Sequence, residues 1–420
     1  MKKLTFRMLK PWQIGRRQAD SQSTGSKKMR NLSPMVSEAD LATLVANNGT
    51  FAFDLYRKIK NLKTNLFFSP YSISGALAMA FAGSRGDTEK EMAHALKYNL
   101  SQDNLHEAFS RLDLRLKERY QRAKAKDTEA FTLNVVNNIW GQKGYDFLAQ
   151  FLDVLAEDYG GGLRLLDFAT GPEQSRTEIN QWISDQTGGK IRDLVPRGVI
   201  DQLTKLVLTN AIYFKASWEF PFNRDLTGEG IFHLSGGIDI SVPMMQQSKP
   251  LGYAEGYDYQ VVELPYEGGQ FSMVIWLPGI EQFDIFAEKL DAGLIKASLE
   301  GLSTQQVKLT LPKFGYNFGF SLKESLAELG MVRAFTGEAD FSGMNGKHDL
   351  LIKDVLHKAF ISLDEAGTEA AAATAVIMQP KSMPLLATEM KVERPFIFLI
   401  REIPTDSILF LGQVLDPAKC

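Results

Sequence analysis

The sequence predicts one large domain of the α+β class, in which helices pack against long sheets. Its 420 residues, 44% of them apolar and 23% charged, have the composition of an ordinary folded protein and can bury a sizeable core. Helical patterns concentrate before residue 123, whereas strand patterns fill most of the remainder. Because no low-complexity linker divides residues 37–420, we expect a single domain there.

The first expected helix begins at a capping residue. Ser37 precedes Asp40 by three positions, so its hydroxyl can cap the exposed amides of a helix that carries Leu41 and Leu44. Helical periodicity resumes over 51–59. Further helices are expected from Pro70, whose missing amide suits a first turn, over 105–122 and over 174–187.

Runs rich in β-branched and aromatic residues predict the strands. The run at 205–215 is apolar on both faces, so we expect it to be a central strand of a sheet that is covered on each side. The other expected strands span 131–140, 259–264, 271–277, 307–311, 396–402 and 407–414.

Residues 1–36 are predicted to form a separate, solvated extension. The first thirty residues carry nine Lys or Arg against one acidic residue, Asp20. The start resembles the basic region of a secretory signal, but Arg7 interrupts its first apolar run and no apolar run follows Arg16 and Arg17. We therefore expect no cleaved signal peptide and no twin-arginine signal, which leaves a cytoplasmic location open.

Composition and motifs exclude several classes of protein. Lys+Arg 47 against Asp+Glu 50 gives a net charge of −3, too close to neutral to indicate a nucleic-acid-binding protein. The single cysteine, Cys420, can form neither an internal disulfide nor a thiolate metal site. No run approaches the roughly 18 apolar residues that span a bilayer. The five histidines lack any short metal-binding spacing and neither GxSxG nor GxxxxGK occurs, so we expect no metal, no cofactor and no active site built from local motifs.

One segment, 364–384, breaks the pattern of a packed domain. Its first half is nearly all small residues, and the run from Ala370 to Ala373 alone would predict a helix. If the run serves as a strand instead, alternate residues from Thr368 to Thr374 face one side, and all of them are small. Such a segment could slide between two existing strands, where a bulky or charged residue would clash or be buried unpaired.

Several motifs spread over residues 37–417 occur together in one known family. They are NLFFSPYSI at 65–73, INQW at 179–182, TGGKI at 187–191, NAIYFK at 210–215, LPKF at 311–314, DFSG at 340–343, HKAF at 357–360 and RPF at 394–396. On these motifs the sequence resembles the serpins, the serine-protease-inhibitor superfamily. The resemblance implies an α+β serpin fold with about nine helices around three β-sheets and an exposed reactive loop that can insert into the large sheet.

The resemblance also assigns roles within the unusual segment. It makes nine residues the mobile hinge of the reactive loop: Glu365, Gly367, Thr368, Glu369, Ala370, Ala371, Ala372, Ala373 and Thr374. The family's spacing of sixteen residues from the hinge glutamate places the cleaved bond between Lys381 and Ser382. A lysine before this bond suits a trypsin-like protease, whose specificity pocket holds a buried acid. Cleavage after Met378 or Met383 remains an alternative, because the register depends on the length of the following segment.

Two further groups of residues follow from the resemblance. The first is a sheet-opening region, with Trp218 near the place where the loop inserts and four polar residues beneath the centre of the sheet: Ser69, Ser72, Asn210 and His357. The second is one face of the helix at 105–122, which carries Arg111, Arg115, Arg119 and Arg122. In some serpins the corresponding region binds sulfated polysaccharide, and a solvated basic face is the simpler interpretation.

The expected function is covalent, suicide-type inhibition of a trypsin-like serine protease by a monomer that is not itself an enzyme. Cross-class inhibition of a cysteine protease is one alternative. The other is a non-inhibitory serpin that acts as a carrier or chaperone, and the small residues of the hinge argue against it. An extracellular location is expected from the family, although no clear signal peptide is evident.

Overall fold

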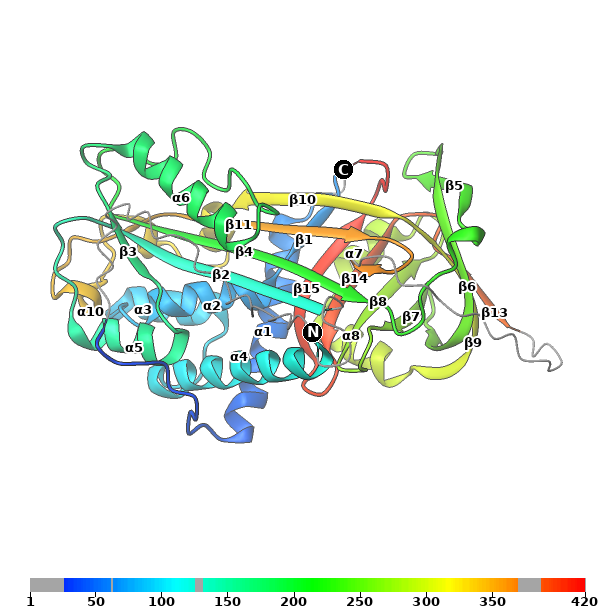
Figure 1. Ribbon diagram of the computed structural model, residues 1–420, viewed down its shortest axis with the longest axis horizontal. Helices are drawn as coiled ribbons and strands as arrows, with labels where there is room; N and C mark the ends of the chain where they lie inside the picture. Colours follow the sequence, from blue (N-terminus) through cyan, green and yellow to red (C-terminus); the bar gives the residue numbers. More distant parts are fainter. Residues whose placement is uncertain (1–25, 62, 125–130, 369–386, 420) are drawn as a thin grey trace, which may run out of the picture.

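The computed structural model describes residues 26–61, 63–124, 131–368 and 387–419 (Figure 1). The helices in these residues are α1 (Glu38–Ile59), α2 (Pro70–Phe81), α3 (Gly86–Leu96), α4 (Gln102–Lys124), α5 (Ala149–Tyr159), α6 (Pro172–Gln186), α7 (Phe283–Lys289), α8 (Ala292–Glu300), α9 (Lys323–Glu328) and α10 (Ser342–Asn345). Two 3₁₀ turns, η1 (Arg224–Leu226) and η2 (Arg333–Phe335), complete the helical part.

The strands form a six-stranded and a nine-stranded sheet. In chain order they are β1 (Leu66–Phe68), β2 (Phe131–Gln142), β3 (Leu163–Leu166), β4 (Leu206–Ser217), β5 (Gly228–Leu234), β6 (Ile238–Glu255), β7 (Tyr259–Pro265), β8 (Phe271–Pro278), β9 (Ser303–Pro312), β10 (Phe314–Ser321), β11 (Ile352–Leu363), β12 (Gly367–Thr368), β13 (Thr388–Lys391), β14 (Phe396–Glu402) and β15 (Ser407–Val414). The smaller sheet has the order β10-β11-β12-β4-β2-β3. The larger has the order β1-β15-β14-β8-β7-β6-β9-β13, with β5 on β6. The described strands thus make two sheets where three were expected, because the 18-residue β6 pairs with β5 near its start and with β7 near its end.

The predicted α+β class is confirmed, and β4 is the central strand that its apolar run predicted. One face of β4, with Leu208 and Ile212, joins the main core above α2. The other face, with Val207 and Ala211, joins a second core beneath α6. Both faces of the six-stranded sheet are therefore covered at its centre (Figure 1), and any change in this sheet must occur inside packed apolar layers.

The predicted capping residues lie where the sequence expects them. The Ser37 hydroxyl accepts a hydrogen bond from the Asp40 amide (3.0 Å) at the start of α1. The Ser69 hydroxyl accepts from the Ser72 amide (3.1 Å) at the start of α2, with Pro70 in the first turn. The two predicted stretches 37–45 and 51–59 form one continuous helix.

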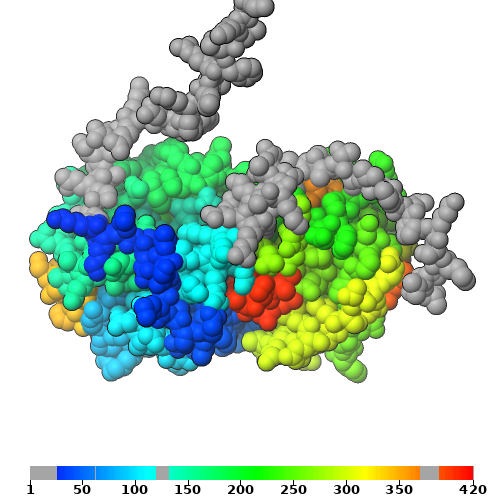
Figure 2. All heavy atoms as spheres, turned by 60° about the horizontal axis from the view of Figure 1, so that its bottom comes forward, coloured from blue at the N-terminus to red at the C-terminus, as the bar shows by residue number. Residues whose placement is uncertain are grey.

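The N-terminal segment lies against the helices from residue 26 onward. Figure 2 shows it in dark blue beside α4 in cyan. The Ser26 hydroxyl donates to Asp153 of α5 (2.5 Å), and the Arg30 guanidinium donates to Asp113 of α4 (2.6 Å). The Asn31 amide donates to the carbonyl of Glu157 (2.9 Å). The sequence predicted a solvated extension through residue 36, but the part from residue 26 onward packs against the protein. It does so because basic residues near its end pair with acidic residues of α4 and α5. Residues 1–25 lie outside the described part.

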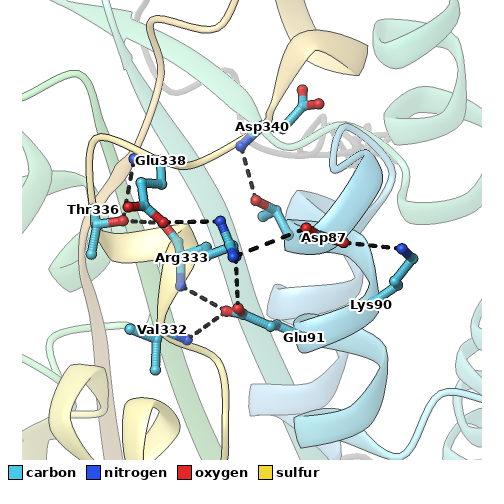
Figure 3. A network of polar contacts seen from close by, with 9 residues as sticks. Asp87, Lys90, Glu91, Val332, Arg333, Thr336, Glu338 and Asp340 are labelled. Carbon is cyan, nitrogen blue, oxygen red and sulfur yellow. Dashed lines mark hydrogen bonds and ion pairs between the residues drawn. The ribbon is translucent and has the colours of Figure 1, made fainter.

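A polar network joins α3 to η2 (Figure 3). The Glu91 carboxylate accepts hydrogen bonds from the amides of Val332 (3.0 Å) and Arg333 (2.7 Å) and from Nε of Arg333 (3.0 Å). The Thr88 hydroxyl accepts from the Asp340 amide (2.9 Å). The Glu91 carboxylate therefore accepts the hydrogen bonds of the free amides at the start of η2. In this way it holds the segment that leads into β11 against α3.

Replacing Glu91 by alanine is expected to lower the free energy of unfolding by about 2 kcal/mol, because it leaves two backbone amides and Nε of Arg333 without their charged acceptor, while Arg333 keeps its contact with Glu338. Lys90→Ala is the matched control, since this exposed neighbour pairs with the exposed Asp87 in Figure 3. Denaturant unfolding of both variants measures the effect. Equal stabilities of the two variants would contradict the role of Glu91.

Within the described residues, no helix is long and apolar enough to cross a bilayer. No group of three or more His, Cys, Asp or Glu is placed to hold a metal ion in the same part of the chain.

Candidate functional site

The centre of the six-stranded sheet is a parallel pairing between β4 and β11. It runs from Leu206 opposite Ile352 to Tyr213 opposite Phe360. Strands β2 and β10 continue the sheet antiparallel on either side of this pair. We call these eight residue pairs the β4–β11 seam. Beyond Phe360 the two strands separate.

Two residues of the predicted hinge already occupy the gap where β4 and β11 separate. Thr368 pairs with Leu363 of β11 and with Ala216 of β4, and Gly367 pairs with Ser217, all antiparallel. Thr368 is fully buried. The two-residue strand β12 is therefore a third strand that begins at one end of the seam.

Gly367 is required at the start of β12 by its conformation and by space. Its φ is +155°, in the region that side chains rarely adopt. A Cβ atom at this position would lie 2.0 Å from the carbonyl oxygen of Ala216 and 2.7 Å from Cα of Ser217. Both neighbours are backbone atoms of β4 that cannot move aside, so only glycine lets the chain turn into the sheet here.

Aromatic side chains hold the turn before β12. The Trp218 and Tyr266 rings stack with centroids 4.6 Å apart and an interplanar angle of 7°. The Trp218 indole N–H donates to the Asp364 carbonyl (3.1 Å), and its backbone amide donates to the carbonyl of Ala366 (2.9 Å). The Tyr266 hydroxyl shares a hydrogen bond with the Thr368 hydroxyl (2.8 Å). Trp218 therefore lies where the resemblance expects it, beside the beginning of the loop.

Glu365 is buried in the same turn and is held by a cation. Its carboxylate accepts from Nζ of Lys313 (3.0 Å) and from the hydroxyl of Thr227 (2.8 Å). Burial alone would raise the pKa of Glu365, but these hydrogen bonds outweigh it and lower the pKa below its ordinary value. Glu365 is thus a buried, charged anchor of this turn.

A buried polar cluster lies beneath the seam, as predicted. Nδ1 of His357 on β11 contacts Oδ1 of Asn210 on β4, and Nε2 of His357 accepts from the Ser69 amide (3.3 Å). The Asn210 amide group donates to the Ser72 hydroxyl and to Asn137 of β2. The cluster therefore links α2 to three adjacent strands, and its contact between His357 and Asn210 crosses the seam.

His357 is neutral in this cluster. Burial lowers its pKa to about 3, because the apolar surroundings disfavour the imidazolium. The neutral ring can accept from Ser69 while it hydrogen-bonds to Asn210 through its other nitrogen.

Three residues of the site were not found from the sequence. Asn137 belongs to a run predicted only as a strand, and it stands among other polar residues, Asn134 and Asn138, so its type alone did not single it out. Tyr266 and Lys313 carry no local signal, because they meet Thr368 and Glu365 only through the fold.

The rest of the predicted loop lies outside the described residues. This applies to the remaining hinge residues from Glu369 to Thr374, to the bond between Lys381 and Ser382, and to the alternatives Met378 and Met383. Their assignments stay predictions.

The predicted basic face of α4 is largely engaged in ion pairs. The Arg115 guanidinium pairs with Glu38 of α1, and Arg119 pairs with the buried Glu402 of β14. The neighbouring Lys117 pairs with Asp113 (2.8 Å). Arg111 lies near Glu38 as well, whose pKa is lowered by its hydrogen bond with Arg115. The side chain of Arg122 lies outside the described part. Charge on this face is therefore partly neutralised within the protein.

Comparison with known proteins identifies the family. Residues 46–417 match the family described as Serpin (serine protease inhibitor). A leukocyte elastase inhibitor of Bos taurus is 40% identical over 385 residues, which cover 89% of this chain and 99% of that protein. A serpin-like protein of Thermococcus kodakarensis is also 40% identical, over 88% of this chain and 84% of its own length.

Solved structures show the same fold. The native state of tengpin, a thermophilic serpin, superposes with a TM-score of 0.80 and 28% identity over 93% of this chain and 97% of that chain. A highly specific serpin of the insect Tenebrio molitor superposes with a TM-score of 0.77 and 31% identity, over 90% of this chain and 99% of its own. The chain belongs to the serpin family of serine protease inhibitors.

Proposed function

We propose that this protein is a covalent, suicide-type inhibitor of trypsin-like serine proteases that is cleaved between Lys381 and Ser382. The observation that carries the proposal is the position of Gly367 and Thr368, which already pair with both β4 and β11 at the end of the seam. A strand that begins at this point can lengthen only along the seam.

In the proposed reaction the serine hydroxyl of the protease attacks the carbonyl carbon of Lys381. The ester forms, the Lys381–Ser382 peptide bond breaks, and the amine of Ser382 leaves with a proton from the protease histidine. The hinge, no longer tethered at its far end, then extends β12 between β4 and β11.

Insertion is favourable because of the hydrogen-bond pattern. It replaces one parallel pairing with two antiparallel ones, which are slightly more stable per residue. Roughly ten additional ladder bonds, at about 1 kcal/mol net each, offset the entropy of ordering the loop. The attached protease is displaced and its oxyanion hole distorted, and loss of one oxyanion donor already slows hydrolysis about 10²- to 10³-fold.

Elastase-type proteases are a second candidate target. The observation that favours them is that several relatives at 38–40% identity are named leukocyte elastase inhibitors. Such a protease would leave Lys381 intact and cleave after an apolar residue, for which Met378 is the candidate in the loop.

Incubation with trypsin, elastase and papain, followed by a denaturing gel, tests these proposals. We expect a complex with trypsin that survives boiling in detergent, and a released C-terminal fragment whose mass begins at Ser382. Lys381→Glu should abolish the trypsin complex and leave any elastase complex unchanged, because neither protease accepts an acidic residue before the cleaved bond. Clean cleavage without an adduct would instead support a non-inhibitory serpin, and an adduct with papain alone would support the cysteine-protease alternative.

The polysaccharide site on Arg111, Arg115, Arg119 and Arg122 is a separate proposal. If it exists, a sulfated polysaccharide at low salt should accelerate inhibition, and the acceleration should disappear at high salt. If the inhibition rate does not respond to the polyanion, these four arginines form only a solvated and ion-paired helix face and bind no polysaccharide.

A further inference from the structure

The turn after α6 places one lysine over both sides of the seam. The ammonium nitrogen of Lys190 lies 5.9 Å from the ring centroid of Tyr213 and 5.8 Å from that of Phe360. Tyr213 belongs to β4 and Phe360 to β11, and the two residues form the last pair of the seam before β12. Their rings have centroids 6.2 Å apart. One cation therefore contacts an aromatic ring on each strand, where β12 would have to advance.

The turn that carries Lys190 is fastened to the sheet on both sides. Nζ of Lys358 on β11 donates to the Arg192 carbonyl (2.6 Å), and the Asn134 amide group on β2 donates to the carbonyl of Gln186 (2.7 Å). Within the turn, the Thr187 hydroxyl accepts from the Ile191 amide (3.1 Å). The turn around Lys190 is therefore held to β11 on one side and to β2, the neighbour of β4, on the other.

We propose that Lys190 is a positioning residue that holds β4 and β11 together and slows insertion of the loop; we call its contact with both rings the clasp. This inference rests on the proposed function. Neighbouring strands lie about 4.8 Å apart, so an inserted strand moves β4 and β11 to about 9.6 Å. The two ring centroids, now 6.2 Å apart, would then lie about 11 Å apart. An ammonium interacts with a ring within about 6 Å of the centroid, so Lys190 could reach both rings only from close to their midpoint, where the side chain of the inserted strand would lie. The double contact exists in the intact protein and is lost when the seam opens.

The test measures how fast a synthetic peptide with the sequence of residues 369–380 converts the intact protein to a heat-resistant form. Lys190→Met keeps the length of the side chain and removes its charge, and we expect a conversion about two- to fivefold faster than that of the wild type. Lys190→Arg should restore the wild-type rate, because a guanidinium also stacks on aromatic rings.

Lys205→Met is the matched control. It removes a contact of the same kind, between Lys205 and the Tyr145 ring (5.5 Å), that does not bridge the seam. Its conversion rate should equal that of the wild type. Phe360→Leu should accelerate conversion as Lys190→Met does, and the double variant should be no faster than either single variant, because both remove the same contact.

The outcomes distinguish a failure of the proposed inhibitory function from a failure of the role assigned to Lys190. If the wild type neither accepts the peptide nor traps a protease, the proposed function fails. If the wild type does both but Lys190→Met converts at the wild-type rate, only the clasp is wrong. A merely structural role of Lys190 would lower the melting temperatures of intact and cleaved protein equally and leave the rate unchanged, whereas the clasp lowers only that of the intact form.

Discussion

Replacing Thr368 by arginine is expected to turn the proposed inhibitor into a substrate. Thr368 is fully buried between β4 and β11, and its hydroxyl bonds to Tyr266. A guanidinium at this position would be buried without a partner, at a cost of several kcal/mol. The intact protein can escape this cost by releasing residues 367–368 from the sheet, whereas the inserted form cannot. Because each 1.4 kcal/mol changes a ratio of rates tenfold, insertion should fall more than about tenfold behind hydrolysis of the acyl-enzyme.

The measurement is the fraction of protein that forms a detergent-resistant complex with trypsin, compared with the fraction that is cleaved. Thr304→Arg is the control, because it adds the same charge at an exposed position of β9. Thr368→Ser keeps the hydroxyl and should retain the complex. A Thr368→Arg variant that still forms the complex at the wild-type yield would sink the insertion mechanism.

Acidification from pH 6.5 to pH 4.5 is expected to remove about 2 kcal/mol of stability through His357. Burial lowers the pKa of His357 to about 3, whereas an unfolded histidine titrates near 6.5. Between these values the unfolded chain binds a proton that the native protein does not. The stabilisation is complete above pH 6.5 and is lost as the pH falls toward 3, at about 1.4 kcal/mol per pH unit.

The groups around His357 do not offset this effect. Asn210 of β4, the Ser69 amide and the Phe320 ring of β10 face the imidazole, and all of them are neutral. His106 of α4 adds to the loss, because burial lowers its pKa to about 4. Acid should therefore loosen the cluster beneath the seam.

Denaturant unfolding of the wild type and of His357→Gln at both pH values measures this contribution. The variant should lose about 2 kcal/mol less than the wild type over the same interval, because glutamine can hydrogen-bond to Asn210 but does not titrate. Identical pH dependence of wild type and His357→Gln would show that the imidazole is not held neutral.

Elements with a strong local pattern could be predicted from the sequence. The capped starts of α1 and α2 and the doubly apolar β4 were found because each depends on a few neighbouring residues. The 18-residue β6 was missed, since it is half exposed and mixes polar with apolar residues. Helices α3 and α5 were missed as well.

Within the site, the sequence by itself determined which positions carry glycine, a small residue or a polar residue. These residue types reflect the local backbone conformation and the space available at each position. Only the tertiary structure decided which side chains meet. Asn137 joined the cluster of Asn210 and His357, and Tyr266 met Thr368, through pairings of strands distant in the chain. Contacts of this kind arise from the register between strands, which depends on the whole sheet and on no local run of residues.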